Sequence, residues 1–231
     1  MSEPADTPEA RLSDAPDWGY LLAEFREMYR GSGAGGSDRI RAHQRTVREA
    51  VGAAMREDPI VRPQPAETKP AARHFARALD RGERERTASL TRAVGHVGGA
   101  LAWRYGYDKV PRGLAERFAF AEIAGPSGPV VTDRIILGLV LFAPGCTYPA
   151  HAHEGIAESY FVLSGTVSEN HAGVYAGGSM IFNPPGHMHR ITVGAREPAL
   201  LAYAWAGPGE KLRNQKMTFS RPRRGGGAGS G

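Results

Sequence analysis

The chain has 231 residues, of which 41% are hydrophobic and 23% are charged, a composition typical of globular proteins. No apolar run approaches the roughly 20 residues that a membrane-spanning helix requires. The N-terminus is polar and lacks the apolar segment of a secretory signal. Cys146 is the single cysteine, so an intrachain disulfide is excluded. We therefore expect a cytoplasmic protein with no membrane partner.

The net charge of +5 is spread along the chain and forms no dense basic stripe. Residues 1–117 carry a net charge of +3, residues 118–220 carry −1, and three arginines follow in the C-terminal tail. Proteins that bind nucleic acids usually concentrate lysine and arginine on one face or along one helix. This distribution therefore argues against a nucleic-acid partner.

The first half of the chain has the apolar periodicity of helices. Large apolar side chains recur at helical spacing from Trp18 to Met28, and Gly31 can end that helix. Ser37 can cap a second helix, whose apolar face runs from Ile40 to Ala54. Two amphipathic helices are therefore predicted within the first 60 or so residues.

A proline-rich segment at 59–70 predicts a loop after the second helix. A third helix is expected over about 71–81. A fourth is expected to be capped by Thr87 and to present an apolar face from Leu90 to Leu101. The N-terminal half is thus predicted to consist of four helices joined by loops.

The hydrophobic period changes near residue 118, where short β-rich runs separated by glycine, proline and polar turns begin. The predicted strands cover residues 134–142, 158–164, 179–183, 190–193 and 199–205. Several short strands at this spacing are typical of a β-sandwich or a small barrel. We therefore divide the chain into a helical region at 1–117, a β-barrel at 118–220 and a disordered Gly/Arg tail at 221–231.

Five of the eight histidines lie between positions 151 and 189. His151 and His153 are two residues apart, so they would share one face of a strand. Glu158 opens the next strand-like run, and His189 follows a proline–glycine turn. A single histidine is usually a core or surface residue, but three imidazoles and one carboxylate together suit a divalent transition metal. These four residues are the candidate metal ligands.

Two spaced patterns around these residues resemble the conserved motifs of the cupin superfamily. The first is Gly145-x5-His151-x-His153-x4-Glu158-x6-Gly165. The second is Gly178-x5-Pro184-x-Gly186-x2-His189, with Val193 where the motif usually ends in asparagine. The resemblance covers about 100 residues. It implies an α+β protein in which the helical N-terminal half precedes a cupin double-stranded β-helix, and it implies a metal site within the barrel.

A narrower resemblance is to the cupin dimethylsulfoniopropionate (DMSP) lyases, most of all to their L-type enzyme. It rests on Tyr148, three residues before the first ligand histidine, and on Tyr160, two residues after Glu158. The helical N-terminal half and the opening run Asp17–Leu22 are also similar. The resemblance implies a carbon–sulfur lyase (EC 4.4.1 class) that converts DMSP to dimethyl sulfide and acrylate by β-elimination.

The implied chemistry assigns roles to four aromatic side chains. The reaction removes a proton α to a carboxylate, and a metal bound to that carboxylate would stabilise the developing charge. Tyr160 is the expected general base, with Tyr148 as the other candidate. Tyr203 and Trp205 lie two apart on the last predicted strand and would receive the sulfonium cation on their aromatic faces.

Several alternatives stay open at this point. The cupin motifs alone are compatible with an Fe(II) dioxygenase, with an isomerase, or with a non-enzymatic ligand-sensing domain. Three histidines and one glutamate can hold Fe, Mn, Co, Ni or Zn. A homodimer is the expected assembly, because dimers are common among cupins. The role of the helices, and that of the 103–107 stretch as a lid, are not fixed by the sequence.

Overall fold

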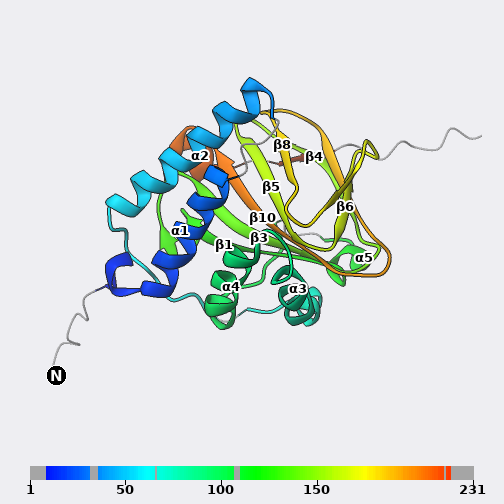
Figure 1. Ribbon diagram of the computed structural model, residues 1–231, viewed down its shortest axis with the longest axis horizontal. Coiled ribbons are helices and arrows are strands. Elements are labelled where there is room, and N and C mark those ends of the chain that lie inside the picture. The colour runs from blue at the N-terminus through cyan, green and yellow to red at the C-terminus, as the bar shows by residue number, and fades with distance from the viewer. Residues whose placement is uncertain (1–8, 32–35, 66, 107–109, 216, 220–231) are drawn as a thin grey trace, which may run out of the picture.

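The computed structural model describes residues 9–31, 36–65, 67–106, 110–215 and 217–219. The predicted disordered tail at 221–231 lies outside these residues. Within them, no helix combines the length and the apolar character that a membrane crossing requires. Apart from one short helix at 209–213, the described helices precede the strands along the chain, and the strands form two sheets (Figure 1). The predicted α+β class is confirmed.

The helices of the N-terminal half agree closely with the prediction. The longer ones are α1 (Pro16–Gly31), α2 (Asp38–Arg56), α3 (Phe75–Gly82) and α4 (Ala88–Val97). The 3-10 turns are η1 (Leu12–Asp14), η2 (Pro70–His74) and η3 (Gly98–Ala100), and the short helices are α5 (Arg112–Ala115) and α6 (Gly209–Arg213). Ser37 caps α2 as predicted, since its hydroxyl accepts a hydrogen bond from the Ile40 N–H at 3.4 Å.

Two details of the helical prediction are wrong. Thr87 precedes α4, but its side chain caps no N–H of that helix. Its hydroxyl donates instead to the carbonyl of Leu163 on the adjacent strand, at 3.4 Å. Leu101 lies beyond α4, because the glycines at 98 and 99 favour ending the α-helix in a 3-10 turn. Both differences arise from contacts and backbone freedom that helical periodicity does not encode.

Within the residues that the structure describes, eleven strands build the two sheets. The first sheet has the order β2-β1-β3-β10-β5-β8, and its strands are β1 (Phe118–Gly125), β2 (Val130–Val131), β3 (Ile136–Phe142), β5 (Ala157–Ser164), β8 (Met180–Asn183) and β10 (Ala199–Ala206). The second has the order β11-β4-β9-β6-β7, with β4 (Thr147–His153), β6 (Thr166–Glu169), β7 (Val174–Ala176), β9 (His189–Val193) and β11 (Met217–Phe219).

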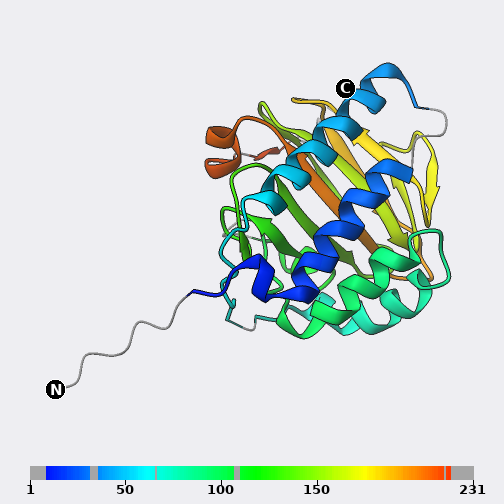
Figure 2. The ribbon, with the colours of Figure 1, turned by 60° about the vertical axis from the view of Figure 1, so that its left-hand side comes forward.

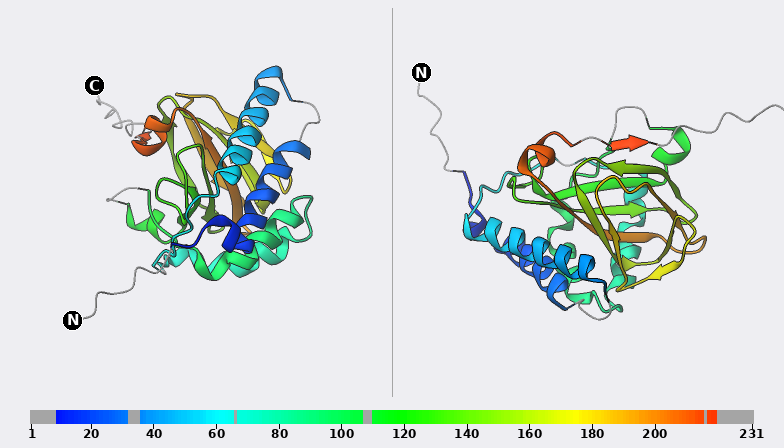
Figure 3. Two further views of the ribbon diagram at one scale, coloured as in Figure 1. Left: turned by 90° about the vertical axis from the view of Figure 1, so that its left-hand side faces the viewer. Right: turned by 90° about the horizontal axis from the view of Figure 1, so that it is seen from above.

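The chain passes repeatedly between these sheets, since β3, β5, β8 and β10 belong to the first, and β4, β6, β7 and β9 to the second. Nearly all pairings are antiparallel, and β1 with β2 is the parallel pair among the described strands. Alternation between facing antiparallel sheets is the double-stranded β-helix expected for a cupin. Seen from above in Figure 3, the strands enclose the barrel while α1 and α2 lie on one side of it.

The first sheet is buried on both faces. Along β3, Leu137, Leu139 and Leu141 belong to a core cluster shared with the helices, whereas Ile136 and Val140 belong to the cluster inside the barrel. This division follows the period of two along a strand. Figure 2 shows α1 and α2 crossing the outer face of this sheet. We propose that the helical region and the barrel, which meet where β1 begins, fold as one unit.

A buried polar cluster connects the helices to β5. The Ser159 hydroxyl lies 2.7 Å from the hydroxyl of Tyr29 on α1 and 2.8 Å from Nε2 of His43 on α2. All three residues are buried. Burial lowers the pKa of His43 to about 4, from an ordinary value of 6.5. The neutral ring is therefore the form that this cluster accommodates.

This burial predicts a pH-dependent loss of stability. Because the folded pKa of His43 is depressed, the unfolded chain binds the proton more readily between pH 6.5 and 4. The free energy of unfolding should then fall as pH drops through that window, by on the order of 3 kcal/mol. Urea denaturation at several pH values should show this fall in the wild type and a flatter profile in His43→Gln. The exposed His171→Gln variant serves as the control, and an equal fall in both variants would contradict the prediction.

Candidate metal centre and active-site pocket

The two sheets bring the four candidate ligands together. His151 and His153 point to one face of β4, and His189 on β9 is the direct register partner of His151. Glu158 is on β5 in the facing sheet. The short turn between β4 and β5 contains Gly155 at φ +72°, a conformation that glycine adopts at little cost. This turn carries the chain from the histidine-bearing strand to the glutamate-bearing strand.

One ligand atom from each of these four residues lies within 4.8 Å of all the others. The side chains are almost fully enclosed, with exposed fractions of 0–3%. Glu158 Oε2 lies 2.8 Å from Nε2 of His189 and 3.5 Å from Nε2 of His153. Both nitrogens of His153, Nε2 of His189 and Oε2 of Glu158 make no hydrogen bond among the described residues. Such buried, unsatisfied donors and acceptors fit a metal ion, which would engage them together.

A second layer of contacts orients the ligand side chains. Nδ1 of His151 lies 3.0 Å from the carbonyl of Pro149, and Nδ1 of His189 lies 3.0 Å from the carbonyl of His187. A ring that donates from Nδ1 to a carbonyl leaves Nε2 as the acceptor or ligand atom. His187 therefore contributes through its backbone carbonyl. Both rings are turned with Nε2 toward the cluster.

Trp205 also belongs to this second layer. Its indole N–H donates a 2.6 Å hydrogen bond to Oε1 of Glu158, and its ring lies 4.3 Å from that of His153. The sequence predicts Trp205 as a sulfonium-binding residue. Trp205 also lines the pocket described below, and its polar atom bonds to the candidate ligand Glu158, which leaves Oε2 of that carboxylate facing the histidines.

The electrostatics of the cluster are set by burial and by the one carboxylate. Burial alone would raise the pKa of Glu158, but the rings of His153 and His189 hold it well below its usual range. Burial would lower the pKa of His189, yet the same carboxylate raises it above its ordinary value. Burial lowers the pKa of His151 to about 4. A divalent cation would compete with the His189 proton, so binding should release protons.

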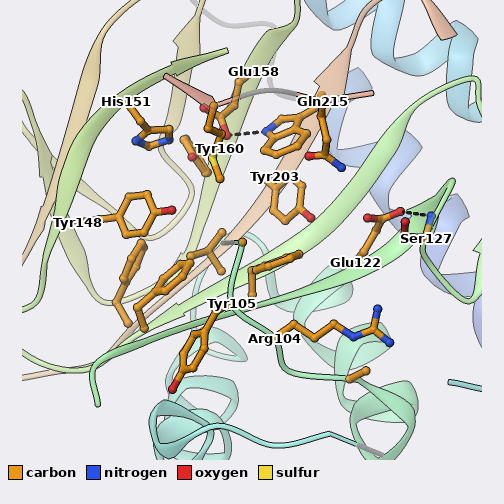
Figure 4. Close-up of a pocket in the computed structure, with 18 of the residues that line it drawn as sticks. Arg104, Tyr105, Glu122, Ser127, Tyr148, His151, Glu158, Tyr160, Tyr203 and Gln215 are labelled. Atoms are coloured by element: carbon orange, nitrogen blue, oxygen red, sulfur yellow. Dashed lines mark hydrogen bonds between the residues drawn. The ribbon is translucent and has the colours of Figure 1, made fainter. Parts of the chain in front are cut away.

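A pocket of about 440 Å³ opens beside the cluster (Figure 4). His151 and Glu158 reach its wall, together with the four aromatic residues predicted from the sequence: Tyr148, Tyr160, Tyr203 and Trp205. The Tyr148 ring stands edge-on to His151 at 4.9 Å, and the Tyr160 ring lies 6.2 Å from His189. Six of the eight predicted site residues therefore line one cavity, and His153 and His189 belong to the cluster beside it.

Burial raises the pKa of two tyrosines in the pocket, Tyr160 and Tyr203. Burial, followed by the negative charge of Glu158, raises the pKa of Tyr160 well above its usual range. Burial raises that of Tyr203 as well, with further contributions from Glu122 and Glu158. A base role for either tyrosine requires a nearby positive charge, and a metal ion at the cluster would supply one.

Other lining residues were not predicted as site residues. Glu122 on β1 faces the pocket, and burial raises its pKa to about 7. The signal in the sequence is an isolated acid within the apolar run 118–125, which was not among the predicted strands. Arg104 and Tyr105, from the stretch considered as a lid, also line the pocket. Tyr107, at the end of that stretch, lies outside the described residues.

The barrel, the buried cluster of histidines and glutamate, and the adjoining pocket together define a cupin-type protein. The side chains of the cluster could hold a metal ion. The family model described as dimethylsulfoniopropionate lyase matches residues 43–201, and the chain belongs to this family. A protein of Cereibacter sphaeroides, named as a proposed dimethylsulfoniopropionate lyase DddL, is 49% identical over 216 residues, which are 94% of this chain and 93% of the relative.

Two solved structures of DMSP lyases share the fold. One comes from the crystal structures of RdDddP and RnDddQII, with a TM-score of 0.66 and 23% identity, covering 90% of this chain and 99% of the other. The second, DddQ from Ruegeria pomeroyi DSS-3, has a TM-score of 0.60 and 20% identity, covering 90% and 98%. The match therefore includes the helical half as well as the barrel.

Metal binding gives a direct test of the second layer. Trp205→Phe keeps an aromatic ring but removes the N–H that holds Glu158, so divalent-metal affinity should fall roughly 10- to 100-fold. Calorimetric titration with Mn²⁺ or Zn²⁺ would measure this change, with one ion bound per wild-type chain. Tyr105→Phe is the control, because its hydroxyl donates to the carbonyl of Ala115, away from the cluster. If Trp205→Phe and the wild type bind the metal ion with equal affinity, Trp205 does not act by orienting Glu158.

Proposed function

We propose that this chain cleaves dimethylsulfoniopropionate to dimethyl sulfide and acrylate by metal-dependent β-elimination. The observation that carries the proposal is the shared pocket, in which a buried histidine–glutamate cluster adjoins two tyrosines in a member of this lyase family. His151, His153, Glu158 and His189 are the proposed ligands of one divalent ion, which is Fe, Mn, Co, Ni or Zn. Binding-site chemistry of this kind is compatible with each of these metals.

The first requirement of the reaction is to stabilise the negative charge that develops on the carbon next to the substrate carboxylate. When bound, the metal ion supplies positive charge that offsets the substrate carboxylate and stabilises developing enolate-like charge. His151 and Glu158 line the pocket directly, so a substrate in the pocket lies next to the cluster. Part of the remaining wall is aromatic, with Phe118, Phe120 and Phe142 among the lining residues, and it restricts the access of water to the reacting carbon atoms.

Tyr160 is the proposed general base. Its phenolate oxygen takes the proton from the carbon next to the carboxylate, and the electrons of that C–H bond form the new carbon–carbon double bond. The carbon–sulfur bond breaks, its electron pair stays on sulfur, and neutral dimethyl sulfide departs without an acid. Tyr160 is fully enclosed beside Glu158, so the positive charge that offsets Glu158 also favours the phenolate.

Tyr148 is the second candidate for the base. It lies on β4, edge-on to His151, and packs against the ring of Phe118 at 4.5 Å. The same packing suits a residue that shapes the cavity around the substrate. Tyr203, on the strand beside Tyr160, supplies an aromatic face for the sulfonium cation.

Membership of the DMSP lyase family favours this reaction over an Fe(II) dioxygenase, an isomerase or a ligand-sensing domain. The buried tyrosines independently favour it over a dioxygenase, because a proton abstraction next to a carboxylate needs a base at the metal and a dioxygenase does not.

Headspace measurement of dimethyl sulfide tests the proposal. Metal-loaded wild type should release dimethyl sulfide from DMSP, and Tyr160→Phe should lower kcat by at least 100-fold, in line with the usual contribution of a general base. Metal content of the variant should stay at the wild-type level, because the phenol is not a ligand. Tyr148→Phe is the matched comparison. A large loss in Tyr148→Phe alone would move the base to that residue, and no release with any of the five metals would remove DMSP as the substrate.

A further inference from the structure

One end of the pocket contains an acidic group that the elimination step does not use. Glu122 on β1 lies on the same row of the first sheet as Tyr160. Tyr160 pairs with Tyr203, Tyr203 pairs with Gly138, and Gly138 pairs with Glu122. Directly opposed residues of antiparallel strands share one face, so these side chains all face the barrel interior. The backbones of Tyr160 and Glu122 are three strand spacings apart, or ~14 Å.

The space between Tyr160 and Glu122 holds one aromatic ring. A Cβ placed on Gly138 would lie 2.5 Å from two atoms of the Tyr203 ring, so this ring lies over the glycine and extends toward β1. Figure 4 shows Tyr203 between Tyr160 and Glu122. The absence of a side chain at Gly138 therefore gives the pocket a continuous floor from the proposed base to the carboxylate.

The carboxylate of Glu122 is held in place and makes no close ion pair among the described residues, and the Arg104 guanidinium acts on it only at longer range. Its Oε1 accepts a 2.9 Å hydrogen bond from the N–H of Ser127 in the β1–β2 turn. The nearest basic residue that lines the pocket is Arg104, which donates to Gln64 at 2.7 Å and lies 3.3 Å from Glu67. Arg104 makes no ion pair with Glu122 in the described part of the chain. A half-buried carboxylate in this position costs free energy that a bound cation would offset.

We propose that Glu122 is the anionic wall of a subsite for the cationic head of the substrate, and that the Tyr203 ring is its floor. That the head is a dimethylsulfonium rests on the proposed function. The substrate carboxylate then lies at the histidine–glutamate cluster and the sulfonium toward Glu122. The positive charge disappears when the carbon–sulfur bond breaks, so neutral dimethyl sulfide loses this attraction and leaves. Glu122 thus selects zwitterions over simple carboxylates.

The test compares two ligands that differ only in charge. 3-(Trimethylammonio)propionate and 4,4-dimethylpentanoate have the same carboxylate, chain and head shape, but only the first has a cationic head. Calorimetric titration of the Mn²⁺-loaded full chain would give both dissociation constants. The wild type should prefer the cation by roughly tenfold, as expected for a partly desolvated charge pair. Glu122→Gln should abolish the preference, and Glu122→Asp should keep most of it.

The ratio of the two dissociation constants distinguishes recognition of charge by Glu122 from a purely structural role. If Glu122 only holds the β1–β2 turn, Glu122→Gln would weaken both ligands equally, the ratio would not change, and the proposal would be overturned. Glu67→Gln is the control, because it removes a negative charge beside Arg104 from a residue that does not line the pocket, and it should leave the ratio unchanged.

Activity measurements distinguish this inference from the proposed function. In Glu122→Gln the KM for DMSP should rise roughly tenfold, with the larger effect on KM than on kcat. A wild type that releases dimethyl sulfide while Glu122→Gln keeps the wild-type ligand ratio would overturn the subsite and leave the lyase intact. If the wild type releases no dimethyl sulfide, but the cation preference of the wild type is lost in Glu122→Gln, the subsite would be supported and DMSP would be overturned as its ligand.

Discussion

The burial of Glu158 among three histidines is the constraint on which the rest of the site depends. An ionised carboxylate at 1% exposure is costly unless opposite charge or hydrogen bonds accompany it. Here the indole of Trp205 satisfies one oxygen, and the other faces His153 and His189. The two facing sheets are required for this arrangement, because they deliver the histidines from one side and the glutamate from the other.

The same charge controls the neighbouring phenols. Glu158 adds to the effect of burial in raising the pKa of both Tyr160 and Tyr203, so neither is a base by itself. Positive charge at the cluster reverses this contribution. In the proposed mechanism, metal binding and activation of Tyr160 are therefore coupled through Glu158, which is a physical reason for a base two residues after a proposed ligand on the same strand.

The helical half supports this chemistry from the opposite side of the first sheet. Ser159 lies between Glu158 and Tyr160 in sequence but faces the helices, where it contacts Tyr29 and His43. Because side chains alternate along a strand, Ser159 and its polar partners lie on one face of β5, and the candidate site residues Glu158 and Tyr160 lie on the other. The helices cover that outer face and exclude water from the polar cluster.

The sequence by itself determined the fold class, the residues of the candidate metal centre and the family resemblance. Short motifs with fixed glycines and spaced histidines report local geometry, and that geometry is what a strand and a tight turn preserve. Helical periodicity likewise located α1 and α2, and the Ser37 cap was predictable because it depends on neighbours only three residues away.

Only the tertiary structure decided which contacts those residues make. Trp205 bonds to Glu158 because strand pairing brings together two residues that are 47 positions apart. Thr87 lies at the start of α4, but its hydroxyl donates to a carbonyl on β5 and not to the helix. Glu122 joined the pocket because β1 pairs with β3 and because Gly138 leaves room for the Tyr203 ring. Such contacts depend on strand register and on the volume of neighbouring side chains. Neither is encoded in the local pattern of the chain, so sequence spacing predicted the candidate ligands and four aromatic lining residues but not Glu122 or the bond between Trp205 and Glu158.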